Sequence, residues 1–171
     1  LNFETKKKDL EKAMIVAQKD FDIISENLNQ IREEICANIN SKMRTILDEI
    51  MMPDINAQFQ LKALDKCNEF GKAEIKLSVL CPSNKKRLLS GGEMSRLLLA
   101  IKIAIAKLDI PIVFDEIDIG IGGATAYKIG NKLAVLSHLG QIIVVTHQAQ
   151  VAAHGNNHIL VEKENGSSTV R

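Results

Sequence analysis

Two acidic residues that follow a short apolar stretch could bind a metal ion or activate water. Asp115 and Glu116 end the segment "IPIVFDE", residues 110–116, and Asp118 comes shortly after them. In parallel α/β sheets, ligands bind beyond the carboxyl ends of the strands, which is where these carboxylates would lie. Carboxylates beside an apolar strand are costly unless a cation or a proton-transfer step uses them. From the residues alone, a cation site with a general base and a plain strand end with an acidic turn are equally supported.

A second chemical feature is the pair of glycines in "SGGE", residues 90–93, directly before an apolar helical segment. Ser90 and Glu93 have the spacing of a capping box, in which each side chain satisfies a backbone N–H at the start of a helix. Capping does not require Gly91 and Gly92, and glycines at a helix entrance usually allow another group to approach the backbone closely. Because a helix N-terminus attracts anions, the segment predicts a phosphate contact in addition to a cap.

Thr146 and His147 end a further apolar segment, "QIIVVTH", residues 141–147. A single histidine at a strand end is usually a structural or a surface residue. If the two apolar strands are neighbours in one sheet, however, His147 lies beside Asp115 and Glu116. Complementary polar groups that converge at one sheet edge favour a functional site.

The elements that would position these residues alternate between helix and strand. Periodicity predicts helices over 92–108, 124–138 and 148–153, and strands over 110–114, 141–146 and 158–162. Strands that alternate with helices form a parallel sheet with right-handed crossovers, so this half of the chain is predicted to be α/β.

The first half of the chain has the apolar pattern of a coiled coil. The apolar residues alternate in steps of four and three, which is a heptad seam: Leu10, Met14, Ala17, Phe21, Ile24, Leu28, Ile31 and Ile35. Two steps of four then reach Ile39 and Met43 and resemble a stutter. One long amphipathic helix packed on a globular core is the alternative. In the coiled-coil interpretation, the partner strand comes from outside this chain.

Pro53 ends the helical region, because the residue before a proline rarely continues a helix. Two alternating segments follow over 58–64 and 73–80, and residues 65–71 between them are predicted to connect an antiparallel hairpin. The predicted domains are a coiled-coil arm helix over 1–52 and an α/β lobe over 53–171. Since the chain starts at Leu1 and stops in a strand-like context, we expect it to be part of a longer protein.

Composition excludes several classes of protein. Hydrophobic residues make up 46% of the chain and charged residues 25%, as in a folded globular protein rather than a disordered one. Lys and Arg number 22 against 21 Asp and Glu, so no bulk charge indicates nucleic acid or an anionic membrane. The 3 cysteines form no CxxC pair, so neither a disulfide framework nor a zinc site is indicated. No apolar run reaches the roughly 20 residues of a transmembrane helix.

Together the three chemical segments resemble the C-terminal lobe of the ATP-binding-cassette (ABC) ATPases. The "SGGE" segment resembles the signature loop of that family, "IVFDE" its Walker B strand, and His147 its switch histidine. The longer strings "SGGEMSR", "FDEIDIGIGG" and "VVTHQAQVAAHGNNHILVEK" are most similar to SMC-like ATPases of bacterial DNA double-strand-break repair. The resemblance covers roughly residues 46–171. It implies an α/β lobe of an ATPase head, with a mostly parallel sheet, an antiparallel hairpin and a long coiled-coil-type helix before it.

The resemblance also implies a role for each motif residue. Residues 90–93 would form a signature loop that contacts the γ-phosphate of ATP held by the opposite subunit. Asp115 would support Mg²⁺, commonly through water, Glu116 would polarise the hydrolytic water, and His147 would touch the γ-phosphate. ATP would join two heads in a homodimer, and hydrolysis would release them. The implied partners are an N-terminal lobe of the same protein and double-stranded DNA, without a membrane, in the bacterial cytoplasm at the nucleoid.

Three departures from the family pattern limit these implications. Gly122 stands where many relatives carry the aspartate of the D-loop, so Asp118 is not assigned that role. Leu89 replaces the small residue expected before the signature serine. No GxxxxGK[ST] phosphate loop (Walker A) occurs in these 171 residues, so the chain supplies half of an ATP site. We expect the parent protein to hydrolyse ATP and this chain alone to show no turnover.

Four other interpretations stay open. A transporter's nucleotide-binding subunit has the same motifs, but no heptad arm of this length before a hairpin. A DNA-end-processing ATPase of the SbcC type differs in the "FDEIDIGIGG" segment. A non-catalytic interaction module would use residues 10–50 as an oligomeric coiled coil and the α/β part as a scaffold. A metal-dependent nuclease would need Asp115, Glu116 and Asp118 to hold two metals, for which a single turn is too local.

Overall fold

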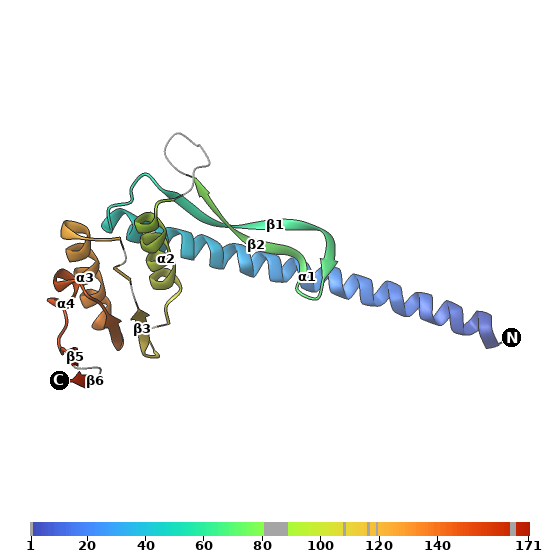
Figure 1. Cartoon of the computed structure of the whole chain (residues 1–171). Helices are drawn as coiled ribbons and strands as arrows, with labels where there is room; N and C mark the ends of the chain where they lie inside the picture. The colour runs from blue at the N-terminus through green and yellow to red at the C-terminus, as the bar shows by residue number, and fades with distance from the viewer. Residues whose placement is uncertain (1, 81–88, 108, 116, 119, 165–166) are drawn as a thin grey trace. The chain divides into compact units, whose positions relative to one another are not determined.

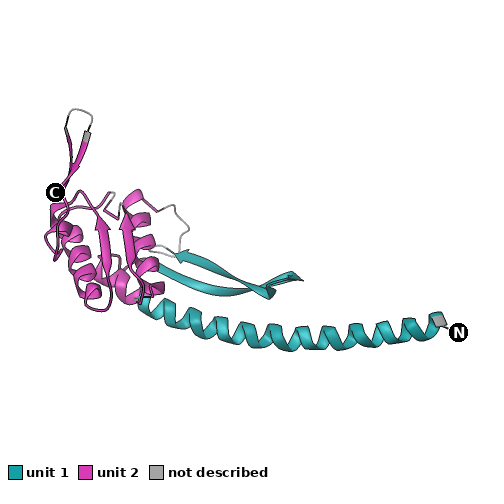
Figure 2. Ribbon diagram, turned by 90° about the horizontal axis from the view of Figure 1, so that it is seen from below, with its two compact units in different colours: residues 1–42, 56–86 teal, residues 43–55, 87–171 magenta. Residues whose placement is uncertain are grey.

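A computed structural model of the chain describes residues 2–80, 89–107, 109–115, 117–118, 120–164 and 167–171. The chain forms two compact units, each built from two separate segments (Figure 2). Unit 1 comprises residues 1–42 and 56–86, and unit 2 comprises residues 43–55 and 87–171. Helices and strands carry the labels of Figure 1.

Unit 1 combines most of a long helix with an antiparallel hairpin. Helix α1 (Asn2–Glu49) contributes its residues up to 42, and strands β1 (Asn56–Asn68) and β2 (Gly71–Leu80) pair antiparallel. The predicted hairpin is confirmed, but the predicted long connection over 65–71 is wrong, because β1 continues to Asn68. The Asn68 side chain accepts a hydrogen bond from the Phe70 N–H at 2.8 Å, and Gly71 has a φ of +106°. These two features let the chain reverse within a short turn.

Polar side chains of α1 hold the hairpin along one face of the helix. Asn40 donates from Nδ2 to the Phe59 carbonyl oxygen at 2.9 Å, and its Oδ1 accepts from the Phe59 N–H at 2.7 Å. Arg32 donates to the Ala73 carbonyl oxygen at 3.0 Å. These side chains satisfy backbone groups that the outer edges of a two-stranded hairpin would otherwise leave unpaired.

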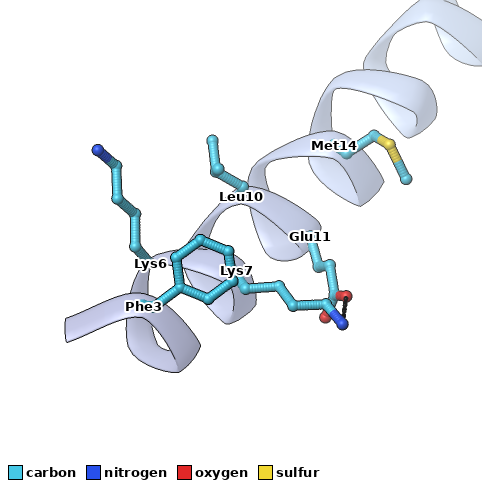
Figure 3. A pocket seen from close by; sticks show the side chains of 6 residues that line it. All are labelled: Phe3, Lys6, Lys7, Leu10, Glu11 and Met14. Carbon is cyan, nitrogen blue, oxygen red and sulfur yellow. Dashed lines mark ion pairs between the residues drawn. The ribbon is translucent and has the colours of Figure 1, made fainter. Parts of the chain in front are cut away.

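The predicted coiled-coil seam is a largely exposed face of α1. Its side chains are 64% exposed at Leu10, 65% at Ile24 and 54% at Ile31, whereas Ser25 and Cys36 on the hairpin side are buried. At the N-terminal end of α1, side chains of this helix line a shallow hollow (Figure 3). Among the described residues, the lining consists of Phe3, Lys6, Lys7, Leu10, Glu11 and Met14. The seam therefore exposes apolar surface along α1.

Helix α1 ends at Glu49, ahead of Pro53, as predicted. Met51 follows with a φ of +63°. The guanidinium of Arg44 donates to the carbonyl oxygens of Pro53 at 2.7 Å and of Ile55 at 3.2 Å. A side chain of the last helical turns therefore fixes the chain reversal that follows.

Unit 2 is built around a pair of parallel strands and two helices. Helix α2 (Gly91–Ile105), strand β3 (Ile112–Asp115), helix α3 (Gly123–Ser137) and strand β4 (Ile142–Val145) follow one another. Strand β3 pairs parallel with β4, which confirms the predicted α/β pattern. The end of α1 adds to the core of this unit, whose largest fully buried apolar side chains are Met43, Leu47, Ile50, Leu97, Leu99, Phe114 and Ile129.

The C-terminal part differs from the predicted pattern. Helix α4 (Ala149–Ala152) is followed by β5 (Val161–Glu164) and β6 (Ser167–Val170), which pair antiparallel in a sheet of their own. The strand predicted over 158–162 thus begins later and does not extend the described parallel pair. Pairing with the next segment of the chain closes a shorter loop than pairing with a distant sheet edge, at a lower entropy cost. Among the described residues, no helix has the length and apolar character needed to span a bilayer.

Candidate functional site

Ser90 caps helix α2, and the predicted capping box is confirmed. The Ser90 N–H donates to Glu93 Oε2 at 2.8 Å, and the Glu93 N–H donates to Ser90 Oγ at 3.3 Å. The Ser90 hydroxyl acts as an acceptor in this pair, so the cap does not use its proton. Unsatisfied backbone N–H groups and the positive end of the helix dipole lie at this same end.

The two glycines that follow Ser90 differ in what surrounds them. A Cβ on Gly92 would lie 2.6 Å from the Gly120 carbonyl oxygen, a contact that real side chains do not make. Gly120 itself has a φ of +68°, which favours glycine. A Cβ on Gly91, in contrast, would meet no described atom within 4 Å. Packing among the described residues therefore requires glycine at position 92, and it gives no reason for glycine at position 91.

The parallel pairing brings the ends of β3 and β4 to one edge of the sheet. Asp115, the last residue of β3, is exposed and lies in register with Val145, the last residue of β4. Thr146 and His147 follow directly, so the predicted neighbourhood of the two strand ends is found. Glu116, the predicted general base, lies outside the described residues. No described hydrogen bond or ion pair joins Asp115 to His147.

Asp118 joins the two strand ends. Its side chain is 1% exposed, and its Oδ2 accepts hydrogen bonds from Thr146 Oγ1, from the His147 N–H at 3.1 Å and from the Gln148 N–H at 3.2 Å. Its Oδ1 lies 3.4 Å from His147 Nδ1 and has no hydrogen-bond partner among the described residues. One buried carboxylate thus ties the loop after β3 to the backbone that carries the histidine.

The pKa of Asp118 lies below the ordinary value of an aspartate. Burial raises this pKa, because a low-dielectric surrounding disfavours the charged form. The hydrogen bonds from Thr146, from its own backbone and from the backbone N–H groups of His147 and Gln148 together lower it by more. Asp118 is therefore a carboxylate at neutral pH, and the hydrogen bonds that it accepts are charge-assisted.

His147 presents its ring to solvent from this anchored loop. The side chain is 70% exposed, and Nε2 lies 3.4 Å from the side-chain nitrogen of Gln148. The backbone N–H of His147 is bound by Asp118, so the loop is fixed while the ring stays accessible. This arrangement suits a histidine that contacts a ligand at the sheet edge.

The described residues do not form a complete metal site. None of their His, Cys, Asp and Glu side chains gather in groups of three that could hold a metal ion. A single carboxylate such as Asp115 fits Mg²⁺ only where phosphate oxygens and water supply the other ligands, which is how this ion is commonly bound beside nucleotides. The nuclease interpretation finds no support among the described residues, since Asp115 and Asp118 belong to no such group and Asp118 Oδ2 binds Thr146 and the backbone.

The sequence motifs give Asp118 no role in anchoring the loop of His147, although its position in the sequence indicates a buried, hydrogen-bonded carboxylate. The residue stands in an apolar context, between Ile117 and Ile121, both of which are buried. An acidic residue within an apolar run must be hydrogen-bonded if it is buried. Its partners are 28 to 30 positions away in the chain, so the sequence alone does not reveal them.

Known proteins with similar sequences match most of the chain. The chain is 32% identical to the DNA repair protein RecN of Deinococcus radiodurans over 146 residues, which is 82% of this chain and 26% of the relative. The chain is homologous to RecN. RecN of Rickettsia prowazekii is 32% identical over 156 residues, 87% of this chain and 28% of the relative. RecN of Streptomyces coelicolor is 48% identical over 84 residues, 48% of this chain and 15% of the relative. No family model matches the chain.

The chain spans about a quarter of the length of the RecN proteins that it matches along most of its own length. The resemblance to SMC-like repair ATPases drawn from the motifs is thus confirmed by RecN matches outside the motifs as well.

Solved structures share the fold. One is the Smc head domain of Pyrococcus furiosus with an extended coiled coil, bound to the C-terminal domain of ScpA. The match spans 98% of this chain and 42% of the Smc chain, with a TM-score of 0.70 and 19% identity. A structure from work on ATP-driven dimerization and DNA stimulated activation of SMC ATPases covers 84% of this chain and 88% of its own, with a TM-score of 0.56 and 23% identity. The predicted fold, part of an SMC-like ATPase head with its helical arm, is confirmed.

Proposed function

We propose that the chain is the C-terminal part of an SMC-like ATPase that repairs and recombines broken double-stranded DNA in the bacterial cytoplasm, at the nucleoid. The homology to RecN supports the repair part of this proposal, and the observation that carries the ATP part is the open approach to Gly91 at the start of α2. Glycine at this position has no explanation in the packing of the described residues, whereas an anion that approaches a helix N-terminus closely would require it. The resemblance of residues 90–93 to the ABC signature loop indicates that this anion is the γ-phosphate of ATP.

The signature loop would act on ATP that a second head holds. The hydroxyl proton of Ser90, the N–H groups of the first turn of α2 and the helix dipole all favour a phosphate oxygen at this point. Gly92 and Gly120 would fix the loop from behind through their close backbone contact. ATP bound in this way would lie between two heads, join them as a homodimer and release them when it is hydrolysed.

In the head that holds the ATP, the site would use the ends of β3 and β4. Asp115 would hold Mg²⁺, through water, beside the phosphates of ATP, and Glu116 would accept a proton from the attacking water. His147 would contact the γ-phosphate from the loop anchored by Asp118. Mg²⁺ would neutralise the charge that develops on the transferred phosphoryl group.

Two exposed apolar surfaces would receive the rest of the parent protein. The strands of the parallel pair expose 57% of Val113, 46% of Ile143 and 53% of Val145, a surface for the N-terminal lobe that carries the phosphate loop. The seam of α1 would pair with the outgoing strand of a coiled coil, which makes residues 1–52 the arm and residues 53–171 the lobe. DNA would bind the assembled protein, since the net charge of this chain, +1, does not favour DNA by itself.

ATP turnover by a reconstituted head tests the proposal. We would mix the chain with a separately produced RecN N-terminal lobe and measure turnover with and without linear double-stranded DNA. We expect turnover that rises with DNA and that falls about a hundredfold or more in Glu116→Gln, since a general base is lost. Gly91→Ala should lower turnover at least about tenfold, because its Cβ enters the space proposed for the phosphate. Asn131→Ala, an exposed change on α3, should leave turnover unchanged.

The alternatives give different results in the same assay. Turnover by the isolated chain that is lost in Glu116→Gln would contradict the half-site. Turnover that does not respond to DNA would leave a generic ABC half-site without a repair function. An assembled pair without turnover would instead favour the non-catalytic coiled-coil module, which the exposed seam of α1 also supports.

A further inference from the structure

The two ring nitrogens of His147 lie beside groups of opposite hydrogen-bonding character. Nδ1 lies 3.4 Å from Oδ1 of Asp118, and an ionised carboxylate can only accept a hydrogen bond. Nε2 lies 3.4 Å from the side-chain nitrogen of Gln148, and an amide nitrogen can only donate. Both neighbours favour the same neutral tautomer, with the proton on Nδ1 and a bare Nε2.

The carboxylate of Asp118 is shared so that one oxygen remains for the ring. Oδ2 accepts from Thr146 Oγ1 and from the N–H groups of His147 and Gln148. Oδ1 is buried, has no hydrogen-bond partner among the described residues and faces Nδ1. A buried carboxylate oxygen without a donor is costly, so a proton on Nδ1 stabilises this loop.

We propose that Asp118 is a positioning residue that keeps the ring proton of His147 on Nδ1 and leaves Nε2 without a proton. The partner of one imidazole nitrogen sets the state of the other. The backbone bonds from Asp118 fix where the ring stands, and Oδ1 fixes which nitrogen is bare.

The consequence for a phosphate ligand rests on the proposed function. Phosphate oxygens accept hydrogen bonds, and a bare Nε2 is itself an acceptor, so the neutral ring of His147 offers the γ-phosphate no donor. The ring can donate to a phosphate oxygen from Nε2 only when a second proton is present there.

The tautomer can be measured on the full chain without nucleotide. Long-range ¹H–¹⁵N spectra distinguish protonated from bare ring nitrogens, and a His147→Gln sample assigns the signal among the 4 histidines. At about pH 8.5, where an ordinary histidine is neutral, we expect the Nδ1–H form to exceed the Nε2–H form about tenfold, the ratio for one charge-assisted hydrogen bond. In Asp118→Asn, the amide oxygen should accept the three hydrogen bonds that Oδ2 accepts in the wild-type chain, and the amide nitrogen should face Nδ1 as a donor. We therefore expect the Nε2–H form to become the major tautomer in this variant.

Gln148→Ala is the matched control, because it removes the donor beside Nε2 and leaves Asp118 in place. Its ratio should stay within about twofold of the wild-type ratio, since the charged partner sets the tautomer. An Nε2–H form in the wild-type chain would overturn the proposal, as would an unchanged ratio in a folded Asp118→Asn chain. If Asp118→Asn does not fold, Gln148→Ala alone decides: loss of the Nδ1–H form in this variant overturns the proposal, and retention of the Nδ1–H form supports it. None of these outcomes depends on ATP turnover, so this proposal and the proposed function fail separately.

Discussion

The loops at the ends of β3 and β4 differ from the seam of α1 in how many of their groups find a partner within the chain. In the loops, the buried Asp118 accepts three hydrogen bonds, and Gly92 accommodates the Gly120 carbonyl oxygen. Along the seam, Leu10 and Ile24 are 64% and 65% exposed. Changes in the loops should therefore alter the stability of this chain, and changes in the seam should alter only its association.

The largest effect is expected from Gly92→Ala. Its Cβ would overlap a backbone oxygen that cannot turn away, so we expect a loss of about 2–3 kcal/mol in the free energy of unfolding, measured with urea. Gly91→Ala is the matched control. It meets no described atom and improves helix propensity, so it should be neutral or stabilising by up to about 1 kcal/mol. Equal losses in both variants would show that the adjacent glycines do not differ.

Acid should have a smaller effect, through Asp118. A carboxylate with a lowered pKa contributes stability above its unfolded pKa, and that contribution is lost as the pH falls through the folded pKa. Between about pH 5 and pH 2, the wild-type chain should therefore lose roughly 1.5 kcal/mol more than Asp118→Asn, the low end for one hydrogen bond to a charged group. The measurement is unfolding at a series of pH values. Parallel curves for the two chains would rule out Asp118 as the acid-sensitive group.

The smallest effect on stability is expected in the seam. Replacing Ile24 and Ile31 with Glu should change the free energy of unfolding by less than about 0.5 kcal/mol, because both side chains are already exposed. The same variant should lose binding to the opposite strand of the coiled coil, measured by sedimentation. Ile23→Glu, at a site 53% exposed but outside the seam, should keep that binding. Retained binding in the seam variant would favour the alternative of one amphipathic helix.

Local patterns in the sequence predict much of this fold, and contacts between distant residues account for what they miss. The capping box of Ser90 and Glu93 spans one helical turn, so its spacing alone reveals it. The sequence pattern misses the short hairpin turn, because the side chain of Asn68 makes the turn for which the pattern predicts a longer polar loop. The role of Asp118 depends on Thr146, 28 positions later, and only the parallel pairing of β3 and β4 brings the two together.

The capping box also limits which side chains suit position 93. Glu93 acts in the cap through one side-chain oxygen that accepts the Ser90 N–H, and glutamine offers a carbonyl oxygen at the same reach. The cap therefore sets a requirement of its own at this position, an acceptor oxygen at the end of a side chain of this length. Glutamine meets that requirement, whereas aspartate is one methylene shorter.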